Sequence, residues 1–250
     1  MKIYGMTDVG MVRSNNQDTF GFCEYDMNCC YAAVCDGMGG HAGGNVASET
    51  ATEAIQQTIS DAYEVFGRDR DICKLLELSL KKANDTVFAR ALEEPDLKGM
   101  GTTAVIAFYI DSAMYVAHVG DSRAYMFSEG KLIPITKDHS VVQEMLDSGE
   151  ITPAEAENHP YRHVITRALG IVADVAVDSR KLEDYSGQTI LLCSDGLTTM
   201  VSVEEIEEVL NTEEPENVCE TLVALANEHG GKDNITVVLL VNDVEGGNGN

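Results

Sequence analysis

The spacing of apolar and polar residues predicts a series of strands interrupted by helices. Apolar runs that alternate with polar residues, or are continuous but bounded by turn residues, are typical of β-strands. Such runs occur at 2–7, 19–24, 31–35, 102–110, 113–120, 122–127, 131–135, 175–182, 189–193 and 235–241. The four runs between 102 and 135 are separated by short turn signals, which predicts an antiparallel meander.

Helical spacing is found in two long segments after the third strand. Small and apolar residues recur at this spacing after Asn45, a candidate N-cap, and again from Ile72 to Ala91. Shorter helices are predicted at 203–210 and 215–229. Strands on both sides of paired helices indicate an α+β fold, in which helices pack against antiparallel sheets.

Length and composition favour one folding unit. The chain has 250 residues, of which 44% are hydrophobic, and this is enough to build the core of one domain. We expect a domain over 1–243, with a polar and partly helical excursion from the sheet at 136–168. The glycine- and asparagine-rich tail at 244–250 is expected to fray and to be disordered.

The balance of charge argues against two classes of partner. The chain has 42 acidic and 17 basic residues, a net charge of −25, and no basic patch, so we expect neither nucleic acid nor a membrane surface as partner. Its seven cysteines lack CxxC spacing and indicate neither a zinc site nor a disulfide framework. Because no signal peptide or spanning segment is evident, we expect a cytoplasmic protein.

Acidic residues at or beside the predicted strands indicate the chemistry. Carboxylates gathered at strand ends repel one another and resist desolvation, so a cluster of them needs cations to offset its charge. Oxygen ligands without a histidine or cysteine constellation select Mg²⁺ or Mn²⁺ over zinc. The hypothesis is a two-metal hydrolase, and the alternative is that each aspartate marks an ordinary turn. The residues concerned are Asp18, Asp36, Asp121, Asp195 and Asp233.

Six short motifs around these aspartates point to a known family. They are RSNNQD (13–18), DGMGG (36–40), GTT (101–103), HVGDSR (118–123), SDGL (194–197) and KDNIT (232–236). In this order they resemble the motifs of the type 2C, or PPM, protein phosphatases, and the resemblance extends from Asp8 to Val241. It implies a four-layer α/β/β/α sandwich of two antiparallel sheets flanked by helices, with a metal-binding cleft at one end. It also implies that 136–168 is the flap segment, which adjoins the cleft in bacterial members.

The resemblance implies roles for single residues. Asp36 resembles the aspartate that bridges two metal ions, and Gly37 the residue whose backbone carbonyl binds one of them. Asp195 and Asp233 resemble further ligands of the first ion, and Asp18 resembles an acidic residue that acts through ion-bound water. Two such ions, Mn²⁺ or Mg²⁺, would lower the pKa of a water held between them and neutralise charge on the phosphoryl oxygens.

Three further residues acquire candidate roles in the same way. Arg13 resembles the phosphate-binding arginine, whose planar fork suits two phosphoryl oxygens; the alternative is a surface ion pair in an acidic neighbourhood. Asp121 resembles a ligand of a third, weaker metal site in bacterial members, and the alternative is a turn aspartate. Asn234 is a candidate for orienting Asp233 by a hydrogen bond.

Two positions depart from the pattern of many family members. Met38 stands where those members have a histidine proposed as general acid, and a methionine cannot donate a proton. His41 and an ion-bound water are the candidate replacements. Gln17 stands where many eukaryotic members have glutamate. Both departures resemble the bacterial branch.

The implied activity is hydrolysis of phosphoserine and phosphothreonine in proteins. The implied partners are the substrates of a bacterial serine/threonine kinase and the kinase itself, and we expect a monomer. One alternative is hydrolysis of small phosphoesters at the same centre. Another is an inactive module that binds phosphorylated partners, although the intact Asp36, Asp195 and Asp233 argue against it.

Overall fold

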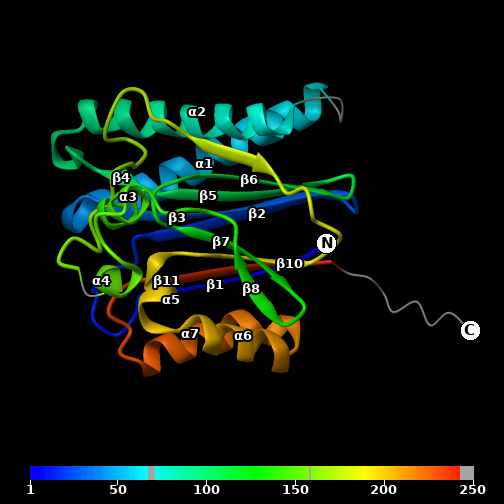
Figure 1. Cartoon of the computed structure of the whole chain (residues 1–250). Coiled ribbons are helices and arrows are strands. Elements are labelled where there is room, and N and C mark those ends of the chain that lie inside the picture. The colour runs from blue at the N-terminus through cyan, green and yellow to red at the C-terminus, as the bar shows by residue number, and fades with distance from the viewer. Residues whose placement is uncertain (67–70, 158, 243–250) are drawn as a thin grey trace, which may run out of the picture.

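The chain folds into two antiparallel sheets that pack face to face, with helices on both outer faces (Figure 1). The computed structural model describes residues 1–66, 71–157 and 159–242, so the tail predicted at 244–250 lies outside the described residues. The observed layers confirm the expected α/β/β/α sandwich.

One sheet has five strands, drawn from both ends and the middle of the chain. In spatial order they are β1 (Lys2–Asp8), β11 (Ile235–Val241), β10 (Thr189–Cys193), β7 (Arg123–Ser128) and β8 (Lys131–Pro134). Helices α5 (Asp195–Met200), α6 (Val203–Thr212) and α7 (Pro215–Glu228) lie on its outer side (Figure 1). Because β1 pairs with β11 from Lys2 opposite Val241 onward, the first and last strands support each other.

The other sheet contains β2 (Asp18–Asp26), β3 (Cys29–Met38), β5 (Ala104–Ile110), β6 (Ala113–Val119) and β9 (Asp178–Lys181), with the short β4 (Gly101–Thr102) paired to the end of β3. Its outer face is covered by α1 (Gly40–Phe66) and α2 (Ile72–Glu93), and a 3₁₀ turn follows at Pro95–Leu97. The flap segment carries α3 (Val141–Ser148) and α4 (Pro153–Glu157). Among the described helices, none combines the length and apolar content needed to cross a bilayer.

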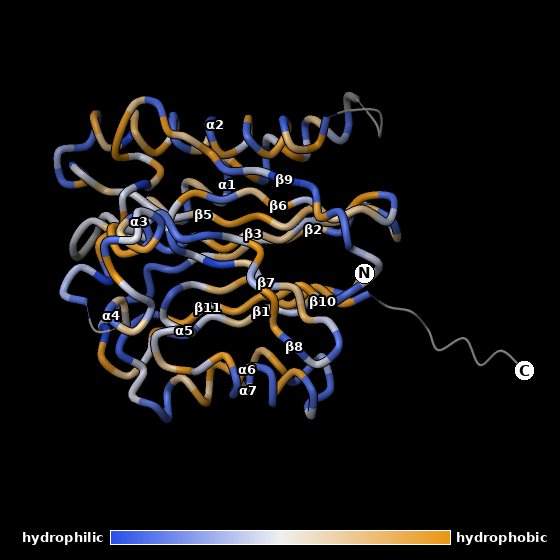
Figure 2. Tube along the Cα trace, viewed as in Figure 1, coloured by the Kyte–Doolittle hydropathy of each residue, from blue (hydrophilic) through white to orange (hydrophobic). Residues whose placement is uncertain are grey.

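Strand β3 shows how the layers are held together. Its residues Tyr31 and Cys35 pack among the residues of α1 and α2, whereas Ala32 and Val34 pack against the five-stranded sheet. All four are essentially inaccessible to solvent. Burial on both faces explains why this strand is a continuous apolar run rather than an alternating one. In Figure 2 the apolar colouring accordingly follows the central strands, while the outer helices change colour with each turn.

The predicted meander is wrong in one respect. Strands β5 and β6 pair with each other in one sheet. Strand β7 pairs with β8 and β10 in the other sheet, and not with β6. The chain therefore changes sheets after β6, at Gly120, which has φ +104°. Apolar alternation and turn residues locate each strand, whereas its partner depends on segments far away in the sequence.

Several predicted boundaries also differ from those in the structure. Strand β3 continues through the DGM residues of the second motif to Met38 rather than ending at Cys35, because β4 pairs with Gly37 and Met38. Helix α1 begins at Gly40, so Asn45 is not its N-cap. Strand β9 begins at Asp178 rather than at 175, and helix α5 was not predicted.

Leu76 and Leu78 of α2 offer a matched test of the core. Leu76 is fully buried and Leu78 is 53% exposed. We predict that Leu76→Ala lowers the free energy of unfolding by about 2–5 kcal/mol, because it leaves a cavity. Leu78→Ala should change it by less than about 1 kcal/mol. Urea unfolding followed by circular dichroism measures both, and equal losses would contradict the assigned core.

Candidate active site

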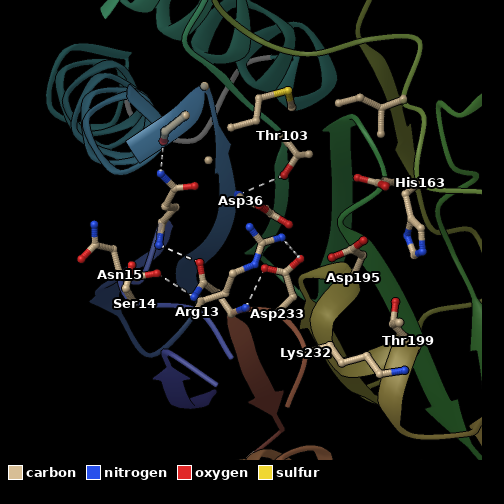
Figure 3. A pocket seen from close by; sticks show the side chains of 18 of the residues that line it. Arg13, Ser14, Asn15, Asp36, Thr103, His163, Asp195, Thr199, Lys232 and Asp233 are labelled. Atoms are coloured by element: carbon tan, nitrogen blue, oxygen red, sulfur yellow. Dashed lines mark hydrogen bonds and ion pairs between the residues drawn. The ribbon is translucent and has the colours of Figure 1, made fainter. Parts of the chain in front are cut away.

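Acidic side chains from distant parts of the chain meet at one end of the space between the two sheets. A cavity of about 720 Å³ opens there. Asp36, Asp121, Asp195 and Asp233 line the cavity, together with Arg13, Gly37 and Asn234 (Figure 3). Asp18 is not among the lining residues and is buried beside Asp36, its partner on the neighbouring strand. The structure therefore brings together all of the predicted site residues.

Strand pairing places the first two carboxylates directly opposite each other. In the register of β2 and β3, Asp18 is the partner of Asp36. On β3, Val34 faces the space between the sheets, so Asp36, two residues later, extends the same row of side chains. Like charges directly opposite each other on paired strands are destabilising. The pair is thus a structural cost unless something offsets its charge.

Asp18 is held rigidly but only half satisfied. Its Oδ2 accepts hydrogen bonds from Ser194 Oγ and Thr236 Oγ1, each at 2.7 Å. Its Oδ1 is buried and has no hydrogen-bond partner among the described residues. Buried acceptors are almost always partnered, and an ion-bound water would fill this place. The orphaned oxygen therefore fits the expected role of Asp18.

Burial and mutual repulsion disfavour the charged forms of these aspartates. Burial, followed by the charge of Asp18, raises the pKa of Asp36 well above its usual value. Burial raises the pKa of Asp121 to about 7 and that of Asp18 to about 6, and it also raises the pKa of Asp195. Without cations the cluster tends to hold protons, and bound cations would displace them.

The carboxylates are spread over the cavity rather than focused on one point. No three of them, within the described part of the chain, bring ligand oxygens within 4.8 Å of one another. An all-oxygen donor set of this kind fits hard divalent cations.

Gly37 brings the backbone itself into the cavity. A Cβ added at this position would lie 2.0 Å from the carbonyl oxygen of Gly44 and 2.6 Å from that of Gln17. Only glycine therefore fits between α1 and the loop before β2. The backbone of Gly37 lines the cavity, where its carbonyl is a candidate ion ligand.

Arg13 lies at the mouth of the cavity and forms an ion pair with Asp233. Its Nη2 donates to Asp233 Oδ2 at 2.7 Å, and both side chains are partly exposed. The hydrogen bond to Asp233, reinforced by its charge, raises the pKa of the Arg13 guanidinium. An exposed pair of this kind contributes little to stability, so other ligands can replace it.

Asn234 contacts Asp233 through its backbone and the neighbouring loop through its side chain. Its side-chain amide donates to the carbonyls of Val9 and Asn15 and accepts from the backbone N–H of Gln17, at 2.8–2.9 Å. The contact with Asp233 Oδ1 is made by the backbone N–H of Asn234, at 2.9 Å. The side chain therefore fixes the loop that carries Arg13, rather than the carboxylate.

Several lining residues had no role in the sequence analysis. Arg162 and His163 come from the flap segment, and Lys232 immediately precedes Asp233. Thr199 lies four residues after Asp195, so the two share a face of α5, but this signal appears only once the helix is known. Figure 3 shows the His163 ring on the side of the cavity where Asp195 lies. The side chain of His41 lies outside the described parts of the structure.

Comparison with known proteins identifies the family. The profile of the family described as Protein phosphatase 2C matches residues 12–228. The chain belongs to the protein phosphatase 2C family. The family to which the six motifs pointed is thereby confirmed.

Relatives in the protein phosphatase 2C family are similar over almost the whole chain. The serine/threonine phosphatase stp of Listeria monocytogenes is 38% identical, with 95% of this chain and 94% of that protein covered. The structure of the S. agalactiae serine/threonine phosphatase has a TM-score of 0.86 at 35% identity and covers 95% of this chain and 98% of that one. The catalytic domain of the serine threonine protein phosphatase PstP, in complex with 2 manganese ions, has a TM-score of 0.80 at 36% identity and covers 95% and 96%.

The raised pKa values predict how ion binding depends on pH. The folded, ion-free protein holds protons on Asp18 and Asp121 more tightly than the unfolded chain does, so their contribution to stability is lost as pH rises through about 6 to 7. Ions bind the deprotonated form. We predict that saturating MnCl₂ raises Tm more at about pH 8 than at about pH 5.5. Thermal unfolding with MnCl₂ or EDTA measures the shift, and equal shifts at both pH values would contradict the ion-ligand assignment.

Proposed function

We propose that this protein is a metal-dependent phosphatase that removes phosphate from phosphoserine and phosphothreonine in proteins. The observation that carries the proposal is the convergence of five aspartates, from separate segments, on or directly beside one cavity that also holds Arg13. The names of the relatives support the substrate class, since those of L. monocytogenes and S. agalactiae are serine/threonine phosphatases.

We assign the ion ligands from the positions of the aspartates. Asp36 would lie between two ions, and Asp195, Asp233 and the carbonyl of Gly37 would complete their coordination. Asp18 would act through ion-bound water, in keeping with its orphaned oxygen. Mn²⁺ or Mg²⁺ suits this oxygen donor set, and the PstP catalytic domain with 2 manganese ions supports the choice.

We assign Asp121 to a third and weaker ion site. It is 9% exposed and borders the cavity, where its pKa is raised by burial and then by the charge of Asp195. A cation near both carboxylates would relieve that repulsion.

In the proposed mechanism Arg13 binds the phosphate and the aspartates hold the ions. When bound, a pair of divalent ions lowers the pKa of a water and neutralises charge on the phosphoryl oxygens. Arg13 offers two parallel N–H donors to the phosphate at the mouth of the cavity. If Asp233 served as an ion ligand, Arg13 would lose its present partner and its guanidinium would be available to the substrate. Cys35, next to Asp36, is fully buried with its pKa raised to about 12, so a cysteine nucleophile is disfavoured.

The setting of the enzyme follows from the same features. We infer one catalytic domain over 1–243, with 136–168 as a flap that contributes Arg162 and His163 to the cavity. We infer a cytoplasmic monomer whose substrates are products of a serine/threonine kinase, together with the kinase itself. The net charge of −25 disfavours nucleic acid and anionic membranes as partners.

A phosphopeptide assay tests the function directly. The wild-type protein should hydrolyse a phosphothreonine peptide with Mn²⁺ and lose this activity with EDTA, and it should prefer the peptide to a nucleotide at matched concentration. Faster hydrolysis of the nucleotide would favour the small-phosphoester alternative.

Asp36→Asn tests the central ligand. We predict a fall in kcat of at least about 100-fold, because removing a shared ligand weakens both ions and their effect on water. The ion-free variant should be at least as stable as the wild type at about pH 8, because a buried charge facing Asp18 is removed. Asp85→Asn, at an exposed position of α2, serves as the matched control. Near-normal activity of Asp36→Asn would overturn the assignment.

Arg13→Ala tests the phosphate contact. Loss of a charge-assisted, two-point hydrogen bond should raise KM for a phosphopeptide by about tenfold or more. Arg13→Lys should recover only part of the loss, since a lysine cannot present the planar fork. Arg90→Ala, on α2 away from the cavity, controls for lost positive charge. Steady-state kinetics at saturating Mn²⁺ gives both constants, and an unchanged KM for Arg13→Ala would place the phosphate elsewhere.

A further inference from the structure

The base of the flap segment is tied to the stretch that carries Asp121. Three consecutive flap residues, 137–139, form hydrogen bonds or ion pairs with residues 118–123. The Lys137 carbonyl accepts a hydrogen bond, the Asp138 carboxylate forms a two-point ion pair, and His139 forms two hydrogen bonds with a glycine. We call these contacts the flap clasp. Its pairs are His118 with Lys137, Arg123 with Asp138 and Gly120 with His139. Asp121 lies inside the clasped stretch, so its position depends on the flap base.

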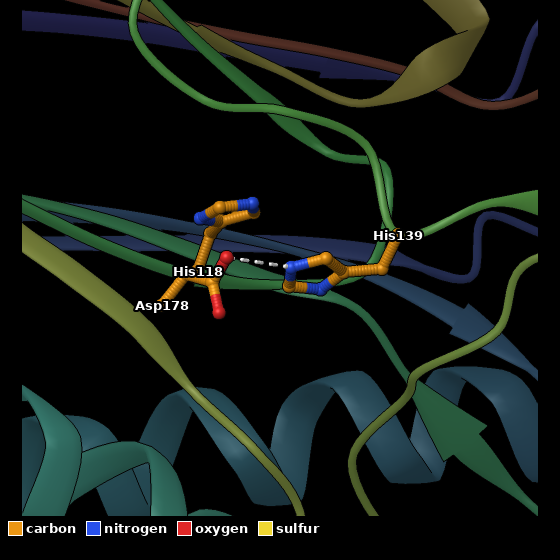
Figure 4. Close-up of side chains that lie close together, drawn as sticks. All are labelled: His118, His139 and Asp178. Carbon is orange, nitrogen blue, oxygen red and sulfur yellow. Dashed lines mark ion pairs between the residues drawn. The ribbon is translucent and has the colours of Figure 1, made fainter. Parts of the chain in front are cut away.

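His139 makes the contact next to Asp121. Its Nδ1 accepts the backbone N–H of Gly120 at 3.0 Å, and its own backbone N–H donates to the Gly120 carbonyl, also at 3.0 Å. Because Nδ1 is an acceptor, the ring proton lies on Nε2, which faces Asp178 Oδ2 at 3.3 Å (Figure 4). The ring is 6% exposed. Its orientation and its tautomer are therefore fixed from both sides.

Gly120 packs against Thr103, which in turn is hydrogen-bonded to the backbone of Asp36. Its φ of +104° is favourable only for glycine, and an added Cβ would lie 2.6 Å from Cγ2 of Thr103. Thr103 Oγ1 accepts the backbone N–H of Asp36 at 3.0 Å, and the Thr103 N–H donates to the Asp36 carbonyl at 2.8 Å. Gly120 is thus held between His139 and the residue that fixes the Asp36 backbone. A shift of Gly120 would move Asp121 relative to Asp36.

The same imidazole is poorly placed to bind a metal ion. His118, His139 and Asp178 bring ligand atoms within 4.8 Å of one another. However, Arg167 Nη1 donates to Asp178 Oδ1 at 2.9 Å and lies 3.2 Å from His139 Nε2. A permanent positive charge therefore occupies the position that a cation would take. The His118 ring stacks on His139 at 4.5 Å between centroids, which supports the ring without using its Nδ1.

We propose that His139 is a positioning residue, which holds the Gly120 N–H so that the Asp121 carboxylate faces the other carboxylates of the cavity. The inference rests on the proposed ion-dependent hydrolysis, with Asp121 as ligand of the weaker ion. His139 itself touches neither substrate nor ion. Its loss should weaken that ion site and turnover while leaving phosphate binding at Arg13 intact.

Two substitutions of similar size separate the two sides of the ring. Asparagine carries its Oδ1 where histidine carries Nδ1, so His139→Asn keeps the acceptor for Gly120 and loses the contact with Asp178. Glutamine places its amide where Nε2 lies, so His139→Gln keeps the reach to Asp178 and loses the acceptor at the δ position. His139→Ala loses both. His229→Ala, at the end of α7, removes an imidazole far from the clasp and serves as control.

Three measurements follow from the proposal. In metal-free protein, hydrogen exchange of the Gly120 amide should speed up in the Gln and Ala variants and stay slow in the Asn variant. Calorimetric Mn²⁺ titration should show the weaker binding event shifted by about tenfold in the Gln and Ala variants, as is typical when a group supporting a ligand is lost. Their kcat should fall by about tenfold with KM changed by less than about twofold. The Asn variant should stay within about threefold of wild type in the exchange rate of Gly120, in the affinity of the weaker Mn²⁺ site, in kcat and in KM.

The outcomes separate this inference from the proposed function. Equal exchange and equal ion binding in the Asn and Gln variants would overturn the role of His139, even if the wild type is an active phosphatase. A rise in KM without a fall in kcat would also overturn it. A wild type without Mn²⁺-dependent phosphopeptide hydrolysis would instead refute the proposed function, and the exchange of Gly120 would still test the contact. If the Ala variant fails to fold, the Asn and Gln pair decides.

Discussion

The mutual repulsion of buried carboxylates is the constraint on which the site depends. Asp18 and Asp36 are direct partners on paired strands, and burial raises the pKa of both. Such an arrangement persists only because a large apolar body holds the strands in register. The fold thus keeps negative charge concentrated in a place where cations bind more favourably than protons at neutral pH. The repulsion between the carboxylates therefore favours the binding of cations, on which the proposed chemistry depends.

The structure divides the site between rigid and tethered parts. Asp18 and Asp36 lie on strands, and Asp195 begins a helix directly after β10. Arg13 instead lies in a loop, which is fixed by the side chain of Asn234 through its bonds to Val9, Asn15 and Gln17. The other two aspartates, Asp121 and Asp233, lie in the short segments that precede β7 and β11. The loop of Arg13, which we propose as the phosphate-binding residue, is also anchored by Asn16 to Thr7 and by Gln17 to Gly40.

The flap segment forms a third part with a different kind of attachment. Its first residues are bound to the end of β6 and the start of β7, and its last turn is bound back to Asp178 by Arg167. Between these anchors the segment delivers Arg162 and His163 to the cavity. The positions of Arg162, His163 and Asp121 are therefore linked, because all three depend on the attachment of the flap base.

The sequence alone determined the strands, the long helices and the set of aspartates that line or adjoin the cavity. Apolar periodicity reflects which faces are buried, and the six motifs carry residue types that only a few chemistries need. Strands β10 and β11 have the predicted bounds, because each is an apolar run flanked by polar turns. The tertiary structure alone decided that β6 and β7 belong to opposite sheets, that DGM continues β3, and that the side chain of Asn234 holds a loop while its backbone N–H contacts Asp233. It also revealed the flap clasp and the roles of Thr199 and His163 in lining the cavity. These features depend on contacts between residues far apart in the chain, and local sequence does not encode the partner of a strand or the direction in which a loop folds back.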